Sequence, residues 1–341
     1  MKNLFRRAVL AAVCASLVPL TSCVHEFPHE EPGSRRVDVH ISHSLEWEQH
    51  DITVSRDGTP ANSVTRYHLQ VYAPDAVGVP VAETEFTRDD LTHADFTTSL
   101  NLPAGNYMLH AWSDFADAAS GTSHFFDTHN FGAITYTEPY NGNNELRDAF
   151  RGAIALSVPE ATPGTDMPVE AELPMERPFA RYEILSVDLV DFLEVETGRG
   201  MLHYSRGESP MAMMSRLPEL RNYRVRVVYS GYMPSVFNNL TNKPIDARTG
   251  MAYDAHINIV SDTEASLGFD HVMVNGSEAN VEVMLEIYDP TGTCIGRSDK
   301  ILVPTKRSRN TTVRGRFLTS KATGGIGIDP TFDDEFTIII N

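Results

Sequence analysis

Apolar and polar residues alternate with a period of two in many short segments of this chain. Val37, Val39 and Ile41, for example, are separated by Asp38 and His40. Strict alternation predicts a β-strand with one face packed against a core and the other face in water. Clusters rich in glycine, proline and asparagine separate the segments, as expected for turns. The clearest alternating segments span residues 37–41, 67–71, 107–111, 223–229, 281–287 and 336–340.

Many short strands predict an all-β fold built from antiparallel sandwiches. A chain of 341 residues is longer than one hydrophobic core usually serves, so we expect two domains in tandem. The prolines at 174 and 178 lie near the middle of the chain and mark the expected boundary. We therefore predict an N-terminal sandwich over residues 36–174 and a C-terminal sandwich over residues 175–341.

Helical signals are few and short. Residues 144–150 predict one or two helical turns, with Asn144 as the N-cap. Residues 211–217 predict another short helix. After the expected boundary, Tyr182 and Ile184 begin an alternating segment that continues through Val187 and Leu189, so residues 182–189 are predicted as a strand.

The N-terminus predicts export and lipid attachment. A basic start, residues 1–7, precedes an apolar run of roughly a dozen residues, which is the length of a secretory signal and too short to span a bilayer. Small residues then precede Cys23, in a pattern that resembles the lipobox of bacterial lipoproteins. We expect residues 1–22 to be removed and Cys23 to be lipidated. Residues 23–35, which contain two prolines and three glutamates, are predicted to form a tether.

The formal charge of the chain is −18, from 28 basic and 46 acidic residues. A surface this acidic repels phosphate backbones, which argues against nucleic-acid binding. It also argues against electrostatic attachment to anionic lipids, so acyl chains must provide the membrane anchor. The acidic residues in the tether resemble the export signal of surface lipoproteins of Bacteroidota, which favours an exposed position on the outer membrane.

Few residues suggest chemistry. If Cys14 leaves with the signal and Cys23 is lipidated, Cys294 has no partner for an intramolecular disulfide. His124, Asp127 and His129 lie in a loop rich in serine and glycine and are candidate metal ligands, but solvated loop side chains are the more common outcome of such spacing. Known hydrolase and phosphate-binding motifs are absent. We therefore expect no catalytic residues, no metal and no cofactor, and predict that the protein is not an enzyme.

Turn and strand-edge motifs recur in seven segments, Leu102–Tyr107, Ala111–Phe115, Tyr140–Asn144, Asp148–Gly152, Arg177–Tyr182, Tyr229–Asn238 and Arg309–Thr319. Together these segments resemble fimbrillin-like lipoproteins of Bacteroidota, specifically a group that carries a domain of unknown function. The resemblance covers nearly the whole chain after the signal. It implies two transthyretin-like β-sandwiches in tandem and a place in or beside cell-surface fimbriae.

The resemblance also implies how subunits associate. Stalk subunits of this superfamily lose an N-terminal strand to an arginine-directed protease and accept a donor strand from the next subunit. Arg35 and Arg36 form a possible cleavage site, but a cut there leaves the first predicted strand in place, which favours a lipid-anchored anchor or accessory subunit. The possible donor strand is the C-terminal segment with Phe336, Ile338 and Ile340, which is predicted either to pair within its own domain or to join another subunit.

A second hypothesis is a surface lipoprotein that binds a glycan or a host protein without forming a polymer. Its binding platform would be an exposed tryptophan, and the chain has only Trp47 and Trp112. Packing of Trp112 in a core or between domains is the more common fate of such a residue.

Overall fold

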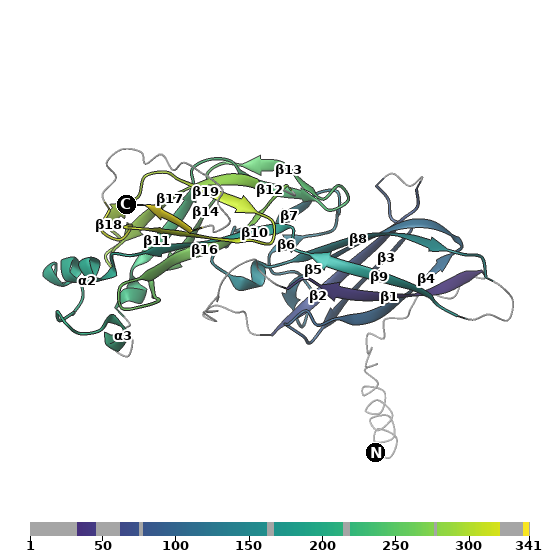
Figure 1. Ribbon diagram of the computed structural model, residues 1–341, viewed down its shortest axis with the longest axis horizontal. Helices are drawn as coiled ribbons and strands as arrows, with labels where there is room; N and C mark the ends of the chain where they lie inside the picture. Colours follow the sequence, from purple (N-terminus) through teal and green to yellow (C-terminus); the bar gives the residue numbers. More distant parts are fainter. Residues whose placement is uncertain are drawn as a thin grey trace, which may run out of the picture.

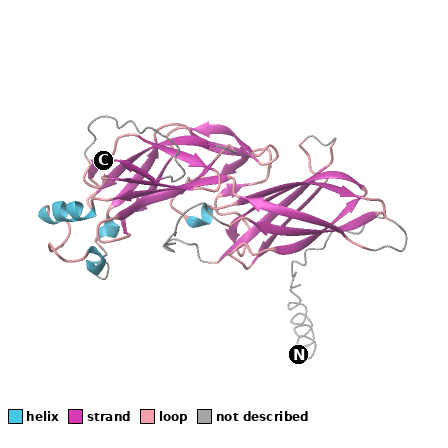
Figure 2. Cartoon of the chain, in the orientation of Figure 1, coloured by secondary structure: helices cyan, strands magenta, loops and turns pink. Residues whose placement is uncertain are grey.

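The computed structural model describes residues 33–45, 62–74, 78–161, 167–213, 219–275 and 278–320, together with the backbone of residues 337–340. Two β-rich halves lie end to end along the long axis of the molecule (Figure 1). Strands make up most of both halves, and the few helices are short (Figure 2). This arrangement confirms the all-β fold class.

The N-terminal half is one seven-stranded sheet in the order β3-β2-β5-β8-β9-β1-β4. β8 and β9 share only two residue pairs, one of them Gly152 with Met175, so the sheet folds over at this point and encloses a core. A Cβ atom on Gly152 would lie 2.9 Å from the Leu173 side chain, which explains the glycine at the fold-over. The strands are β1 (Ser34–His43), β2 (Ser63–Tyr72), β3 (Ala82–Arg88), β4 (Phe96–Pro103), β5 (Gly105–Asp117), β8 (Phe150–Val158) and β9 (Val169–Glu176).

The C-terminal half contains two five-stranded sheets. One has the order β15-β16-β10-β20-β21, and the other is built from β14, β11 and β17, with β18 and β19 both paired to β17. The strands are β10 (Phe179–Ser186), β11 (Arg224–Tyr229), β14 (Ala252–His256), β15 (Asn258–Ile259), β16 (Ala265–Met273), β17 (Glu278–Tyr288), β18 (Cys294–Arg297), β19 (Ile301–Lys306), β20 (Asn310–Gly315) and β21 (Thr337–Ile340).

A fourth sheet, of four strands, joins the two halves. β6 (Phe126–Asp127) and β7 (Ile134–Tyr136) come from the N-terminal part of the sequence, but β7 pairs with β12 (Met233–Asn238), which in turn pairs with β13 (Lys243–Arg248). All four lie where the halves meet (Figure 1). Buried side chains of the segment that runs from β5 through β6 and β7 to η1 therefore belong to the same hydrophobic cluster as the core of the C-terminal half.

The positions of the strands follow the alternating sequence pattern closely, with two differences from expectation. β9 runs to Glu176 and β10 begins at Phe179, so the last N-terminal strand extends past the expected boundary at residue 174. Three strand pairs are parallel, namely β1 with β9, β10 with β20 and β20 with β21. The other strand pairs in the described residues are antiparallel, as predicted.

Two of the described helical segments match the predictions and two do not. The 3₁₀ turn η1 (Glu145–Arg147) forms as predicted, and the Asn144 side chain accepts a hydrogen bond from Leu146 N at 2.9 Å. α3 (Pro210–Met213) overlaps the second predicted helix, and η3 (Leu220–Asn222) is a further single turn. The predicted strand over 182–189 is wrong at its end, because β10 stops at Ser186 and the helix α2 (Leu189–Gly198) follows.

Candidate functional site

The lipidation site Cys23 and the signal over residues 1–22 lie outside the described residues. Most of the tether does as well, and the description begins at Gly33, one residue before β1. None of the helices in the described ranges is long and apolar enough to cross a bilayer. Lipid attachment therefore stays a prediction from the sequence.

Arg35 and Arg36, the possible cleavage site, lie within β1 rather than in a loop. Their backbones pair with Leu102 and Asn101 of β4. The Arg35 guanidinium donates to the Met167 carbonyl oxygen at 2.6 Å, and Arg36 Nε donates to Asp38 at 2.7 Å. Proteases cut extended, accessible backbone, so cleavage here requires the first residues of β1 to separate from β4.

The rest of β1 is part of the core. Val37, Val39 and Ile41 have no exposed side-chain surface, and the strand lies between β9 and β4. It forms eight residue pairs with β4 and seven with β9. The predicted tether over residues 23–35 is therefore too long at its end, because β1, an interior strand of the N-terminal sheet, already includes Ser34 and Arg35.

The C-terminal strand β21 pairs within its own half. Its backbone lies parallel to β20, with Ile338 opposite Val313 and Ile340 opposite Gly315. It is the edge strand of its sheet. Phe336, the first residue of the possible donor segment, lies outside the described residues. Donation of this strand to another subunit stays a prediction.

A buried ion pair lies at the junction of the two halves. Arg147, in η1, places Nε 3.1 Å from Asp270 Oδ1 in β16, and the two side chains are 1% and 0% exposed. The Arg147 guanidinium also donates to the Tyr140 hydroxyl at 3.0 Å and to the Asn141 carbonyl oxygen at 3.2 Å. Its planar group lies over the ring of Tyr136, 4.6 Å from the centroid. A buried charge is tolerated only with such partners.

Tyrosine hydroxyls complete the network around Asp270. Tyr229 donates to Asp270 Oδ2 at 2.7 Å, and Tyr140 donates to the same oxygen. Tyr182 donates to the Tyr229 hydroxyl at 3.0 Å and lies 3.2 Å from the hydroxyl of Tyr253. Burial raises the pKa of each of these four hydroxyls well above its ordinary value. The tyrosines therefore stay protonated and act as donors, and the network has a structural role.

Two other arginines link separate segments of the chain at this junction through an ion pair and hydrogen bonds. Arg177, in the short connection between β9 and β10, pairs with Asp148 at 2.8 Å and donates to the Leu45 carbonyl oxygen at 2.7 Å. Arg151 Nε, in β8, donates to the Asn239 side chain at 3.0 Å. Asn239 itself donates to the Ala111 carbonyl oxygen in β5. These contacts hold the end of β1 and the start of the C-terminal half against the same junction.

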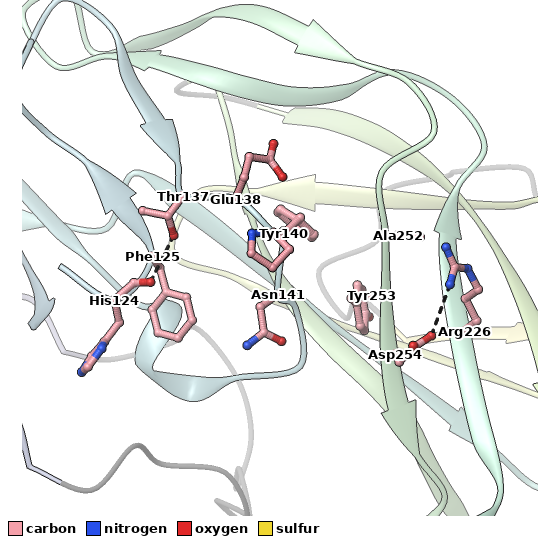
Figure 3. A pocket seen from close by; sticks show the side chains of 11 residues that line it. His124, Phe125, Thr137, Glu138, Tyr140, Asn141, Arg226, Ala252, Tyr253 and Asp254 are labelled. Carbon is pink, nitrogen blue, oxygen red and sulfur yellow. Dashed lines mark hydrogen bonds and ion pairs between the residues drawn. The ribbon is translucent and has the colours of Figure 1, made fainter. Parts of the chain in front are cut away.

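A pocket of about 460 Å³ opens beside this network. Tyr140 and Asn141 line it from the N-terminal half, while Tyr253, Arg226 and Asp254 line it from β14 and β11 (Figure 3). Arg226 and Asp254 form an ion pair of 3.7 Å at its rim. Aromatic rings beside amide and charged groups can hold a small polar molecule such as a sugar. The remaining lining residues are His124, Phe125, Thr137, Glu138, Pro139 and Ala252.

Trp112 is not a binding platform. Its side chain is 0% exposed, and it packs against Phe126, Phe179 and Phe237 from both halves. Its Nε1 donates to Asp114 at 3.2 Å. Because Trp112 is buried, it is excluded as the exposed tryptophan of the second hypothesis. The other candidate, Trp47, lies outside the described residues.

His124, Asp127 and His129, the candidate metal ligands, do not form one cluster in the structure. His124 Nε2 lies 3.1 Å from the Ser63 hydroxyl, whereas Asp127 lies 2.7 Å from His129 Nδ1. In the ranges that the structure describes, no group of three or more histidine, cysteine, aspartate or glutamate side chains is placed to hold a metal ion.

Comparison with known protein families assigns the chain. The family model of DUF6562, a family of unknown function, matches residues 32–341. The chain belongs to this family. The match begins just before β1 and includes both halves, so the junction network and the C-terminal strand are parts of one DUF6562 unit. A search of curated proteins found no match.

Solved structures that resemble this DUF6562 chain include several proteins from Bacteroidota. A candidate polysaccharide-binding protein from Bacteroides thetaiotaomicron is 13% identical, with a TM-score of 0.45, and the match covers 78% of this chain and 80% of that one. A candidate adhesin from the same species is 12% identical, with a TM-score of 0.43 and the same coverage of 78% and 80%. The fimbrial anchor protein Mfa2 from Porphyromonas gingivalis is 12% identical, with a TM-score of 0.38 and coverage of 77% and 81%.

Proposed function

We propose that this DUF6562 protein is a lipid-anchored, fimbrillin-like structural or adhesive subunit of the cell surface, in an anchor or accessory position. Cys23 holds it in the outer membrane, and other fimbrial subunits are its partners by β-strand addition. The N-terminal sequence supports the proposed localisation, and the position of β1 supports the proposed mechanical role. Fimbrial anchor and candidate adhesin proteins are among the structures it resembles, but similarity at this level does not carry the proposal.

The position of β1 is the observation that supports an anchoring role. Force applied between the tether and the body of the protein acts along β1. Ladder hydrogen bonds run across the strand direction, so such force loads the pairs with β4 and β9 together rather than one at a time. Three fully buried side chains, Val37, Val39 and Ile41, hold the strand in the core as well. A subunit that stays attached to the membrane needs this kind of connection.

The proposal includes no catalysis, and the absence of enzyme activity stays a prediction. The glycan-binding alternative now depends on Trp47, which lies outside the described residues, or on the junction pocket, because Trp112 is buried. That pocket has aromatic and polar lining residues, but the Tyr140 hydroxyl donates inward, to Asp270, and is not available to a ligand. We therefore keep the structural subunit as the favoured function.

Fractionation of cells tests the proposal. We expect the wild-type protein in the outer-membrane fraction, accessible to added protease on intact cells, and we expect Cys23→Ala to leave that fraction. Cys294→Ser is the matched control and should stay in the membrane, since Cys294 is an exposed thiol in the C-terminal half. A Cys23→Ala protein that remains with membranes would contradict the lipid anchor.

The mature N-terminus distinguishes an anchor from a stalk subunit. Mass spectrometry of the protein from fimbriated cells should find residues 23–36 still attached to the body. A mature chain that starts at Arg36 or Val37 would instead show cleavage at the arginines and assign the protein to the polymer.

A further inference from the structure

The edge strands of the sheets differ in how they are protected. An unpaired strand edge invites another strand unless it is short, charged, bulged or interrupted by proline. β3 has Glu83, Glu85 and Arg88 along its length. β13 has three charged residues, a proline and two irregularities in its register. These edges carry the usual protection against addition.

β4 lacks this protection. It is eight residues long, with the sequence FTTSLNLP, and has no charged side chain. It pairs with β1 through a regular register and lies at the end of its sheet. Its only proline, Pro103, is the last residue. In the part of the chain that the structure describes, β4 is the one edge strand of more than six residues without a charge.

The side chains of β4 allow it to pair with itself. In an antiparallel pair about a two-fold axis through Ser99, Thr98 lies opposite Leu100 of the second copy, and Phe96 lies opposite Leu102. These residues occupy the core-facing positions of the strand, so apolar side chains would meet apolar or Thr side chains. On the other face, Thr97 lies opposite Asn101. A strand that pairs with its own copy often brings like charges together, which is destabilising, but no like charges meet in this pair.

The two ends of the edge also have opposite charge. Asp95 directly precedes β4, and its side chain is 57% exposed. Arg36, 64% exposed, and Arg35 lie opposite Asn101 and Leu102 at the other end. Antiparallel pairing brings the acidic start of one β4 to the basic end of the other, which is electrostatically complementary. A parallel arrangement would place like charges together.

We propose that β4 is a docking edge for a second copy of this chain, in an antiparallel pair centred on Ser99. The N-terminal sheets of two copies then form one continuous sheet. This contact is separate from strand addition by the C-terminal segment and does not depend on the proposed fimbrial role.

Disulfide trapping on cells tests the register. In a Cys294→Ser background, Ser99→Cys should form a disulfide-linked dimer on oxidation, because residue 99 faces its own copy across the axis. Thr97→Cys is the control on the same strand, since its counterpart lies opposite Asn101 and is out of reach of a disulfide. Thr84→Cys is the control on the β3 edge. Equal cross-linking of all three variants, or none with Ser99→Cys, would overturn the proposal.

Sedimentation of the full chain in detergent tests the energy of the contact. Ser99→Glu places two new carboxylates beside Asp38 of both copies, since the Ser99 hydroxyl donates to Asp38 at 2.6 Å, and should weaken dimerisation at least tenfold. Thr84→Glu, on β3, should leave it unchanged. Circular dichroism checks that both variants fold. A wild-type protein that stays monomeric at all concentrations, or a Ser99→Glu protein that dimerises as the wild type does, would refute the inference.

Discussion

Arg147 and Asp270 form a buried ion pair that links the two halves of the molecule. Arg147 Nε lies 3.1 Å from Asp270 Oδ1, with both side chains almost fully removed from solvent. Arg147 belongs to the connection that precedes β8, whereas Asp270 lies in the middle of β16. The pair, with its tyrosine partners, makes the junction a specific polar core rather than a simple apolar contact.

We expect loss of one member of this pair to be strongly destabilising. Asp270→Asn leaves the Arg147 charge buried without its partner, which typically costs about 3–5 kcal/mol of unfolding free energy. Urea denaturation measures the change. The matched control is Asp191→Asn, which removes a pair to Arg316 at 2.6 Å in which both side chains are 53% exposed and should cost less than about 1 kcal/mol. Similar effects from both variants would mean that the junction network is not energetically special.

Gly142 is predicted to tolerate no larger residue. A Cβ atom there would lie 2.5 Å from the Tyr253 ring and 3.0 Å from Asp270 Oδ2. We expect Gly142→Ala to lower the midpoint of thermal unfolding, since the clash displaces groups of the junction network. Gly198→Ala, at the end of α2, has open space around the added methyl group and should be neutral or slightly stabilising. A Gly142→Ala protein as stable as the wild type would show that the network can shift without cost.

The two halves should unfold together. Trp112, in β5, packs against Phe179 of β10 and Phe237 of β12, so its removal leaves a cavity that both halves share. We expect Trp112→Ala to cost about 3–5 kcal/mol. Hydrogen exchange should show lower protection in β5 and in β12 alike. Loss of protection confined to the N-terminal half would indicate that the halves are independent domains.

Buried histidines predict acid sensitivity. Burial lowers the pKa of His43 to about 4 and that of His93 to about 3. Burial, with Arg151 nearby, lowers the pKa of His110 to about 4. In the unfolded chain a histidine binds a proton near pH 6.5, so the unfolded state binds more protons below that pH. The contribution of these histidines to the unfolding free energy is then fully present above pH 6.5 and falls as the pH decreases toward 4.

Urea denaturation between pH 7 and pH 5 measures this effect before most carboxylates titrate. His93→Asn should reduce the slope of the unfolding free energy against pH by up to about 1.4 kcal/mol per pH unit. Asparagine suits the positive φ of 51° at this position. His203→Asn is the control, because the His203 side chain is 95% exposed. A stability that does not change across this range would contradict the burial of the histidines.

Alternation predicted the strands well, and in β1 and β11 the buried residues alternate with partly exposed ones as expected. In β2 and in the second half of β5 both faces are buried. Residues 37–41, 107–111 and 223–229 all lie within or overlap strands of the structure. The helix α2 was missed for a local reason. Its residues include the β-branched and aromatic types that favour strands, and Asp188, which precedes it, does not cap the helix with its side chain. The Asp188 carboxylate instead accepts hydrogen bonds from Leu318 and Thr319, far away in the sequence.

The sequence by itself determined the strand periods, and it predicted a boundary at residue 174 and a lipid-anchored N-terminus, because these depend on local composition and spacing. Only the tertiary structure decided that β7 joins β12, that Trp112 is buried between the halves and that Arg147 meets Asp270. Each of these depends on which distant segments pack together. Pairing between distant strands is set by the shape and volume of a shared core, and no period of two in a single segment records it.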